Sequence, residues 1–253
     1  MHQFRRSLLM EEDIEAGDSP TNRTDVGVVH YKGIERLCLW CGLVATLVIF
    51  VCVTVSTIIA SADEFTWEDN ALSDLGRPGA STFWLFNCGL TGGGCIGLPF
   101  AWPVWKVSYF RMERANVCFF ITAMLSLAFI GIFHLPTSPH GWFAFFFFIG
   151  VPLTLFIYGR NQRYHGHNRV AAISIILGTG YVLMWATWIP VSITRSSADW
   201  FAVTEYLSGT IFGSWLVMVG WVLLKWDADS RRVVCETGTG IHVQHIDTSL
   251  MTG

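Results

Sequence analysis

The chain has 253 residues, of which 52% are hydrophobic and only 14% are charged, and its mean hydropathy is +0.46. Charged residues make up about a quarter of an ordinary soluble domain, so this composition excludes that class and indicates a membrane protein. The formal net charge is -3, and no basic patch is interleaved with aromatic residues. Nucleic acid is therefore excluded as an expected partner, and membrane lipids are the expected surroundings.

The two ends of the chain are polar. Residues 1–34 carry an acidic cluster and few large apolar side chains, so they cannot build a core and are predicted to form a disordered cytoplasmic tail. Residues 227–253 are predicted to form a second disordered cytoplasmic tail for the same reason. A transmembrane domain is expected between them, over residues 35–226.

Six apolar runs follow one another within that domain. Each has about the 20 residues that a helix needs to cross roughly 30 Å of hydrocarbon. The sequence therefore predicts an all-α, polytopic membrane bundle of six transmembrane helices. The runs are placed at 37–62, 82–104, 115–134, 141–159, 170–193 and 201–225.

The basic residues predict the orientation of these runs. Cytoplasmic loops carry the excess of Lys and Arg. Of the 16 Lys and Arg residues, all but Arg77 and Arg195 lie in the tails or in the connections on one side of the predicted bundle. Both termini are therefore predicted to be cytoplasmic, and the segment around residues 70–76 is predicted to lie on the outer side.

Small residues in the second run predict how it packs. Gly89, Gly93 and Gly97 are four residues apart and form a smooth stripe on one face of a helix. Such stripes allow close approach of two membrane helices, so we expect helix–helix association through these glycines. Pro99 and Pro103 should kink the same run near its inner end.

The most polar, turn-rich segment between two long apolar runs is Asn70-Ala-Leu-Ser-Asp-Leu-Gly76. Three further ionisable residues are expected at the same outer end, because His134 ends the third run, His140 begins the fourth and Glu205 lies about one turn into the sixth. Ionisable groups at membrane depth are costly unless paired or hydrated, so they usually face the bundle interior. We therefore predict that these residues share an outer-facing polar pocket. Its candidate members are Asn70, Ser73, Asp74, Asn87, His134, His140 and Glu205.

Several interpretations of this group remain open. Two imidazoles and two carboxylates are a ligand set for Zn²⁺ or another divalent metal that would acidify a bound water. The two histidines lack the spacing of a helical zinc motif, and haem ligation would need them on facing helices. Alternatively, Asp74 caps its loop through backbone N–H groups, the histidines lie in a wet turn and Glu205 is interfacial.

The motif from Asn70 to Gly76, followed by Phe86-Asn87-Cys88-Gly89-Leu90, resembles the domain-of-unknown-function 998 membrane family. The turn after the third span and Glu205 fit the same layout, so the resemblance covers about residues 37–225. More distantly, Ser73-Asp74-Leu75-Gly76 is similar to an element of the Frag1/DRAM/Sfk1 six-span proteins, which implies a link with membrane lipids. The closer family has no established activity, so the resemblance implies six spans but no reaction.

Three classes of function are compatible with the sequence. The first is a non-enzymatic membrane protein that binds a lipid or a partner through the polar pocket. The second is a metal-dependent lipid hydrolase or transferase that uses the same residues. The third is a small-solute transporter, which the glycine and proline breaks favour and the lack of a charged residue at mid-bilayer disfavours.

Overall fold

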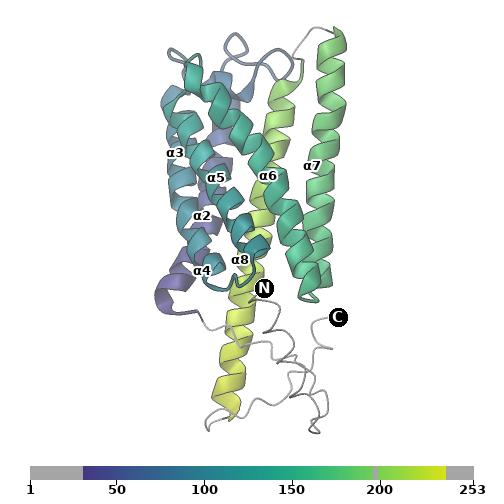
Figure 1. Ribbon diagram of the computed structural model, residues 1–253. Helices are drawn as coiled ribbons and strands as arrows, with labels where there is room; N and C mark the ends of the chain where they lie inside the picture. Colours follow the sequence, from purple (N-terminus) through teal and green to yellow (C-terminus); the bar gives the residue numbers. More distant parts are fainter. Residues whose placement is uncertain (1–30, 196–198, 238–253) are drawn as a thin grey trace, which may run out of the picture.

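The computed structural model describes residues 31–195 and 199–237, and this part of the chain is helical, with no strand. The long helices run alternately up and down the bundle (Figure 1). The elements are α2 (Gly33–Ile59), η1 (Leu72–Gly76), α3 (Phe83–Gly97), η2 (Leu98–Phe100), α4 (Ala101–Lys106), α5 (Arg111–Ile132), α6 (Ser138–Tyr164), α7 (Asn168–Arg195) and α8 (Phe201–Thr237).

The bundle has two distinct ends. The loop end, at the top of Figure 1, is where α2, α5 and α7 finish and where α3, α6 and α8 begin. The base, at the other end, is where α2 begins and α4 finishes. The loop end carries the longest described connection, residues 60–82, and this connection contains η1.

Local signals explain where several helices begin. Glu35, in the first turn of α2, accepts the Lys32 backbone N–H at 2.9 Å, and Glu113 of α5 accepts that of Phe110 at 3.0 Å. A carboxylate in the first turn satisfies one of the N–H groups that a helix start leaves unpaired and complements the helix dipole. Pro139 occupies the first turn of α6, where its missing N–H costs nothing.

Aromatic residues fill the centre of the bundle. Trp215 of α8 is 2% exposed and stacks on Phe212, with ring centroids 5.9 Å apart. Tyr158 of α6 meets the Trp215 ring edge to face at 5.2 Å, and Phe120 of α5 lies beside both Phe212 and Trp215. The core therefore joins α5, α6 and α8.

Five helices are long and apolar enough to cross a membrane, namely α2, α5, α6, α7 and α8. The predicted run at 82–104 forms one pass through the bundle, but it is divided among α3, η2 and α4. The break falls at Leu98–Phe100, where Pro99 interrupts the helical hydrogen bonding, so the predicted proline kink is present as a 3-10 turn.

The glycines of α3 make the close approach that their spacing predicts. A Cβ on Gly89 would lie 2.3 Å from Cys52 Cβ, and one on Gly93 would lie 2.2 Å from Ile49 Cγ1, both on α2. Gly97 lies against Met124 of α5. This face of α3 is thus covered within the chain itself.

The domain limits differ from those predicted. Residues 1–30 and 238–253, the larger parts of the two predicted tails, lie outside the described residues. The predicted tail at 227–253 is wrong for its first part, because α8 continues to Thr237 and Asp227 is completely buried. A polar residue just past an apolar run resembles a tail in sequence, but here it has partners in the fold.

Candidate functional site

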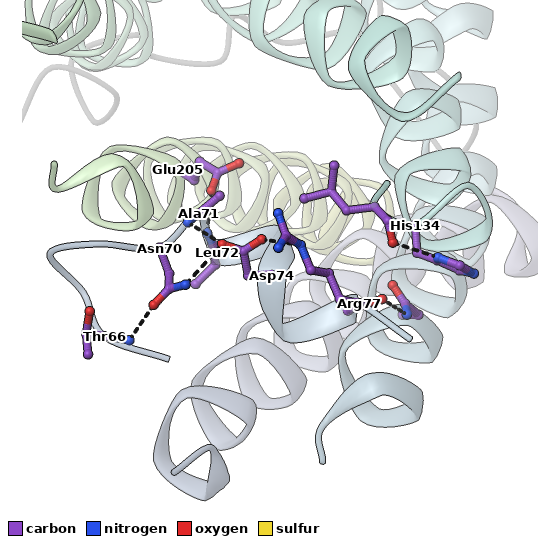
Figure 2. Close-up of polar contacts among 11 residues, drawn as sticks. Thr66, Asn70, Ala71, Leu72, Asp74, Arg77, His134 and Glu205 are labelled. Carbon is purple, nitrogen blue, oxygen red and sulfur yellow. Dashed lines mark hydrogen bonds and ion pairs between the residues drawn. The ribbon is translucent and has the colours of Figure 1, made fainter. Parts of the chain in front are cut away.

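Two carboxylates bind the start of η1 at the loop end (Figure 2). Asp74, within η1, accepts the Ala71 backbone N–H at 2.9 Å. Glu205, on the first turns of α8, accepts the Leu72 backbone N–H at 2.5 Å and faces the Ser73 N–H. Both residues thereby satisfy N–H groups that the start of a helical turn leaves unpaired.

Asn70 links this turn to the rest of the connection. Its Nδ2 donates to Asp74 Oδ2 at 3.3 Å, and its Oδ1 accepts the Thr66 N–H at 2.8 Å. Its backbone carbonyl accepts the Ala202 N–H at 3.2 Å, which brings the connection onto α8. Asn70 and Asp74 are therefore hydrogen-bonded to each other, and Glu205 binds the same turn through the Leu72 N–H (Figure 2).

The other end of η1 is held by α3. Asn87 is 6% exposed and donates from Nδ2 to the Gly76 carbonyl at 2.9 Å. A Cβ on Gly76 would lie 2.5 Å from Asn87 Oδ1, so this approach requires glycine. Thr82 donates to the Leu75 carbonyl at 2.9 Å, and Ser73 is buried between these contacts. Polar groups from α3 and α8 thus hold both ends of η1.

The two histidines serve a different segment, the hairpin between α5 and α6. His140 is 7% exposed and its Nδ1 bonds the Phe133 carbonyl at 2.9 Å, at the end of α5. His134 Nδ1 bonds the Leu135 carbonyl at 3.0 Å, and its ring packs against Phe83. The described hydrogen bonds and ion pairs do not join either imidazole to Asp74 or Glu205.

The carboxylates and the histidines contact different segments, and this separation concerns the interpretation of the four residues as metal ligands. Within the described ranges, no three His, Cys, Asp or Glu side chains are grouped so that they could hold a metal ion. The carboxylates bind η1 and the imidazoles bind their own hairpin. The four side chains therefore do not form the ligand set that their order in the sequence suggested.

One cation stands at the edge of the carboxylate group. Arg77 pairs through Nε with Asp74 Oδ1 at 2.7 Å. The Asp74 side chain is 11% exposed, whereas that of Arg77 is 56% exposed. A largely buried carboxylate thus pairs with an arginine whose side chain is more than half exposed, and Arg77 was not among the residues predicted from the sequence.

A second polar cluster, at the base, was also missed. We call Tyr31, Glu35, Arg36, Lys106 and Asp227 the base cluster. Asp227 accepts the Tyr31 N–H at 2.9 Å and lies 3.4 Å from Arg36 Nε, while Glu35 pairs with Lys106. Burial, and then the charges of Asp227 and Glu35, raise the pKa of the Tyr31 phenol.

Only part of this cluster left a signal in the sequence. Glu35 stands three residues after Lys32 at a helix start, which is the spacing of a helix cap. Asp227 lies 196 residues from its partner Tyr31, so no local pattern connects them.

Comparison with known proteins identifies the family of the chain. A family model described as "Protein of unknown function (DUF998)" matches residues 43–222, which is more than half of the chain. No curated protein and no solved structure matches the chain. The similarity to Frag1/DRAM/Sfk1 proteins stays an expectation from the Ser73–Gly76 motif. With its five apolar helices, this chain is an integral, multi-pass membrane protein that belongs to the DUF998 family.

Proposed function

We propose that this protein binds an anionic phospholipid at the loop end and catalyses no reaction there. The observation that carries the proposal is the Asp74–Arg77 pair. Its bond uses Nε, and the Arg77 side chain remains 56% exposed. We infer that the exposed part of this side chain includes the terminal guanidinium nitrogens and that they bind a phosphate, which arginine recognises through paired hydrogen bonds.

The surroundings of Arg77 suit a membrane boundary. Three exposed tryptophans belong to the segments at the loop end. They are Trp84 (75% exposed), Trp142 (66%) and Trp200 (49%). Tryptophan is enriched at the level of lipid headgroups, where its ring is apolar and its N–H remains hydrated. A cation at this level meets phosphates rather than hydrocarbon.

The other polar groups of the site support a binding role over a catalytic one. The Asp74 and Glu205 carboxylates accept backbone N–H groups, and the Nδ1 atoms of His134 and His140 bond backbone carbonyls. A general base must be able to reach a proton on the substrate. Side chains that hold the backbone in place are poorly suited to that task, so the hydrolase alternative receives no support from these contacts.

The proposal includes a topology of six spans with both termini in the cytoplasm. In this topology the divided pass α3–η2–α4, second in chain order, is a span in addition to the five long helices. The distribution of Lys and Arg gives the orientation. Tag protection in sealed vesicles should find both termini on the same, cytoplasmic side. A C-terminus labelled from outside would contradict this topology.

The lipid proposal is tested with the full-length protein in nanodiscs. Replacing part of the phosphatidylcholine with phosphatidylglycerol should raise the Tm of the parent protein, because a ligand that binds only the folded state stabilises it. The Arg77→Gln variant should lose this increase. Arg111→Gln, at the exposed start of α5 and at the base, is the matched control and should keep it. An equal response of the parent and Arg77→Gln would overturn the proposal.

A second candidate function, passage of a small polar solute, is favoured by the break at Leu98–Phe100. Transporters often use interrupted helices near the middle of the membrane. Proteoliposomes should then take up glycerol or urea faster than protein-free vesicles do. Equal uptake rates would exclude these solutes and leave the lipid proposal unaffected.

A further inference from the structure

A small cavity lies beside the break in α3–η2–α4, where α4, α5, α6 and α8 meet. Its walls include Phe100, Phe120 and Trp215, together with two polar side chains, Asn116 of α5 and Tyr158 of α6. The space open to the centre of a water-sized sphere is about 10 Å³. A volume of this size is about what one water molecule requires.

The two polar side chains present unsatisfied atoms. Asn116 is 3% exposed and Tyr158 is 4% exposed. Neither Asn116 Oδ1 nor Tyr158 Oη has a hydrogen-bond partner among the described residues. Buried polar atoms are nearly always paired with protein or with ordered water, because leaving them unpaired is costly.

The third polar group on the wall is already satisfied. The Trp215 indole N–H donates to Ser174 Oγ at 3.1 Å. Two polar atoms on the cavity wall thus remain without a hydrogen-bond partner in the described part of the chain: the amide oxygen of Asn116, which is an acceptor, and the hydroxyl of Tyr158. An anion would face the amide oxygen unfavourably, and a metal cation would leave the phenol proton without an acceptor.

We propose that this cavity is a binding site for one water molecule. The water donates a hydrogen bond to Asn116 Oδ1 and accepts a hydrogen bond from the Tyr158 hydroxyl. It thereby links α5 to α6 at the level where the pass α3–η2–α4 is broken.

The direction of the change in Tm caused by Tyr158→Phe tests the proposal. If water is bound, the variant loses a hydrogen bond and its Tm should fall by about 2–4 °C, the shift typical of one net hydrogen bond in a chain of this size. If the cavity is dry, the variant removes an unpaired hydroxyl, and its Tm should stay unchanged or rise. Either of these last results would overturn the proposal.

Tyr181→Phe is the matched control. Tyr181 is 2% exposed, and its hydroxyl donates to the Phe148 carbonyl at 3.1 Å. The Tm of Tyr181→Phe should fall whether or not the cavity holds water, which sets the scale for removing a tyrosine hydroxyl that is hydrogen-bonded within the protein. Adding Asn116→Leu to Tyr158→Phe should lower the Tm by less than Asn116→Leu does in the parent, because both act on the same water. Fully additive changes would contradict a shared water.

A direct observation decides the matter even if a variant fails to fold. A structure of the full chain in nanodiscs, at a resolution where other ordered waters are visible, should show one compact density within hydrogen-bonding distance of both Asn116 Oδ1 and Tyr158 Oη. An empty cavity or an elongated density would overturn the proposal.

Discussion

Glu205 binds a backbone N–H that lies 133 residues away in the sequence, at Leu72. The distance is 2.5 Å, and the bond fixes η1 against the beginning of α8. An acceptor at this position is needed because η1 cannot satisfy its own first N–H groups. The side chain thus joins the longest connection at the loop end to the last helix.

Replacing the Glu205 carboxylate should show how much it contributes to the free energy of unfolding. Glu205→Leu leaves the Leu72 N–H unpaired and should reduce the free energy of unfolding by about 1–3 kcal/mol. Glu205→Gln keeps an acceptor oxygen and should lose clearly less. Thermal unfolding followed by tryptophan fluorescence measures both variants.

The control for this pair is Glu68, which is exposed on the same connection. Glu68→Gln and Glu68→Leu should both leave the Tm nearly unchanged. If Glu205→Leu were as stable as the parent protein, the carboxylate would not be holding η1.

At this scale the sequence predicted residues better than it predicted their partners. Asp74 was expected either to join a metal-ligand set with the histidines or to cap its loop, and the structure shows the cap, at the Ala71 N–H. The cap is local in sequence, so turn chemistry could identify it. Glu205 was expected only as a pocket or interfacial residue, because its partner Leu72 is brought to it by the packing of α8.

Among the elements, α3 depends on glycine at particular helical positions. Gly89 and Gly92 are three residues apart, but a Cβ on Gly89 would lie 2.3 Å from Cys52 Cβ, whereas a Cβ on Gly92 would meet nothing within 4 Å. Gly89→Ala should therefore push α3 from α2 and reduce stability by about 1–3 kcal/mol. Gly92→Ala should be neutral or stabilise the helix by up to about 1 kcal/mol.

The two alanine variants are compared by Tm and by yield of monodisperse protein in detergent. Similar losses in both would mean that backbone flexibility, rather than the α2–α3 contact, explains these glycines. The spacing of four residues identified this face from the sequence, because helical periodicity is local. The partner residues Cys52 and Ile49 could not be identified, since nothing in the pattern specifies which helix covers the stripe.

The connection between α6 and α7 should respond to pH through His167. Its ring lies 4.4 Å from that of Trp226, and burial, followed by the nearby His165, lowers the pKa of His167. The folded protein therefore binds a proton here less readily than the unfolded chain. The stability from this group is fully present above about pH 6.5 and is lost as the pH falls toward the lowered pKa.

The test compares the parent with His167→Phe, which keeps a ring beside Trp226 but cannot titrate. The decrease in Tm between about pH 8 and about pH 5.5 should be smaller in the variant than in the parent. Identical pH profiles would show that His167 contributes nothing to the pH dependence of stability.

For the molecule as a whole, the end of the folded domain lies beyond the last apolar run. Ending the chain after Trp226 removes Asp227 and leaves the buried Tyr31 N–H unpaired. We expect this truncation to cost about 1–3 kcal/mol of stability. A chain that ends after Thr237 retains α8 and is the matched control, so its Tm should stay close to that of the full chain.

These truncations contrast the sequence prediction with the structure. The predicted boundary at 226 would make both truncations equally harmless. Hydropathy predicted the positions of the long helices, because each of them corresponds to a contiguous run of apolar residues. It placed the last boundary too early, because Asp227 is polar in sequence and local sequence does not reveal its contacts with Tyr31 and Arg36.

The two long-range bonds of α8 also set an order of assembly. Leu72 and Tyr31 receive their acceptors, Glu205 and Asp227, from α8, the last helix of the described residues, across 133 and 196 residues. Contacts of such high sequence separation form late, because the whole intervening chain must first be made and brought together. Until α8 has been translated, the Tyr31 N–H before α2 and the Leu72 N–H of η1 therefore lack these acceptors. One helix thus supplies an acceptor at the loop end and another at the base, so a chain that stops before this helix is complete would lack the bond at both ends of the bundle.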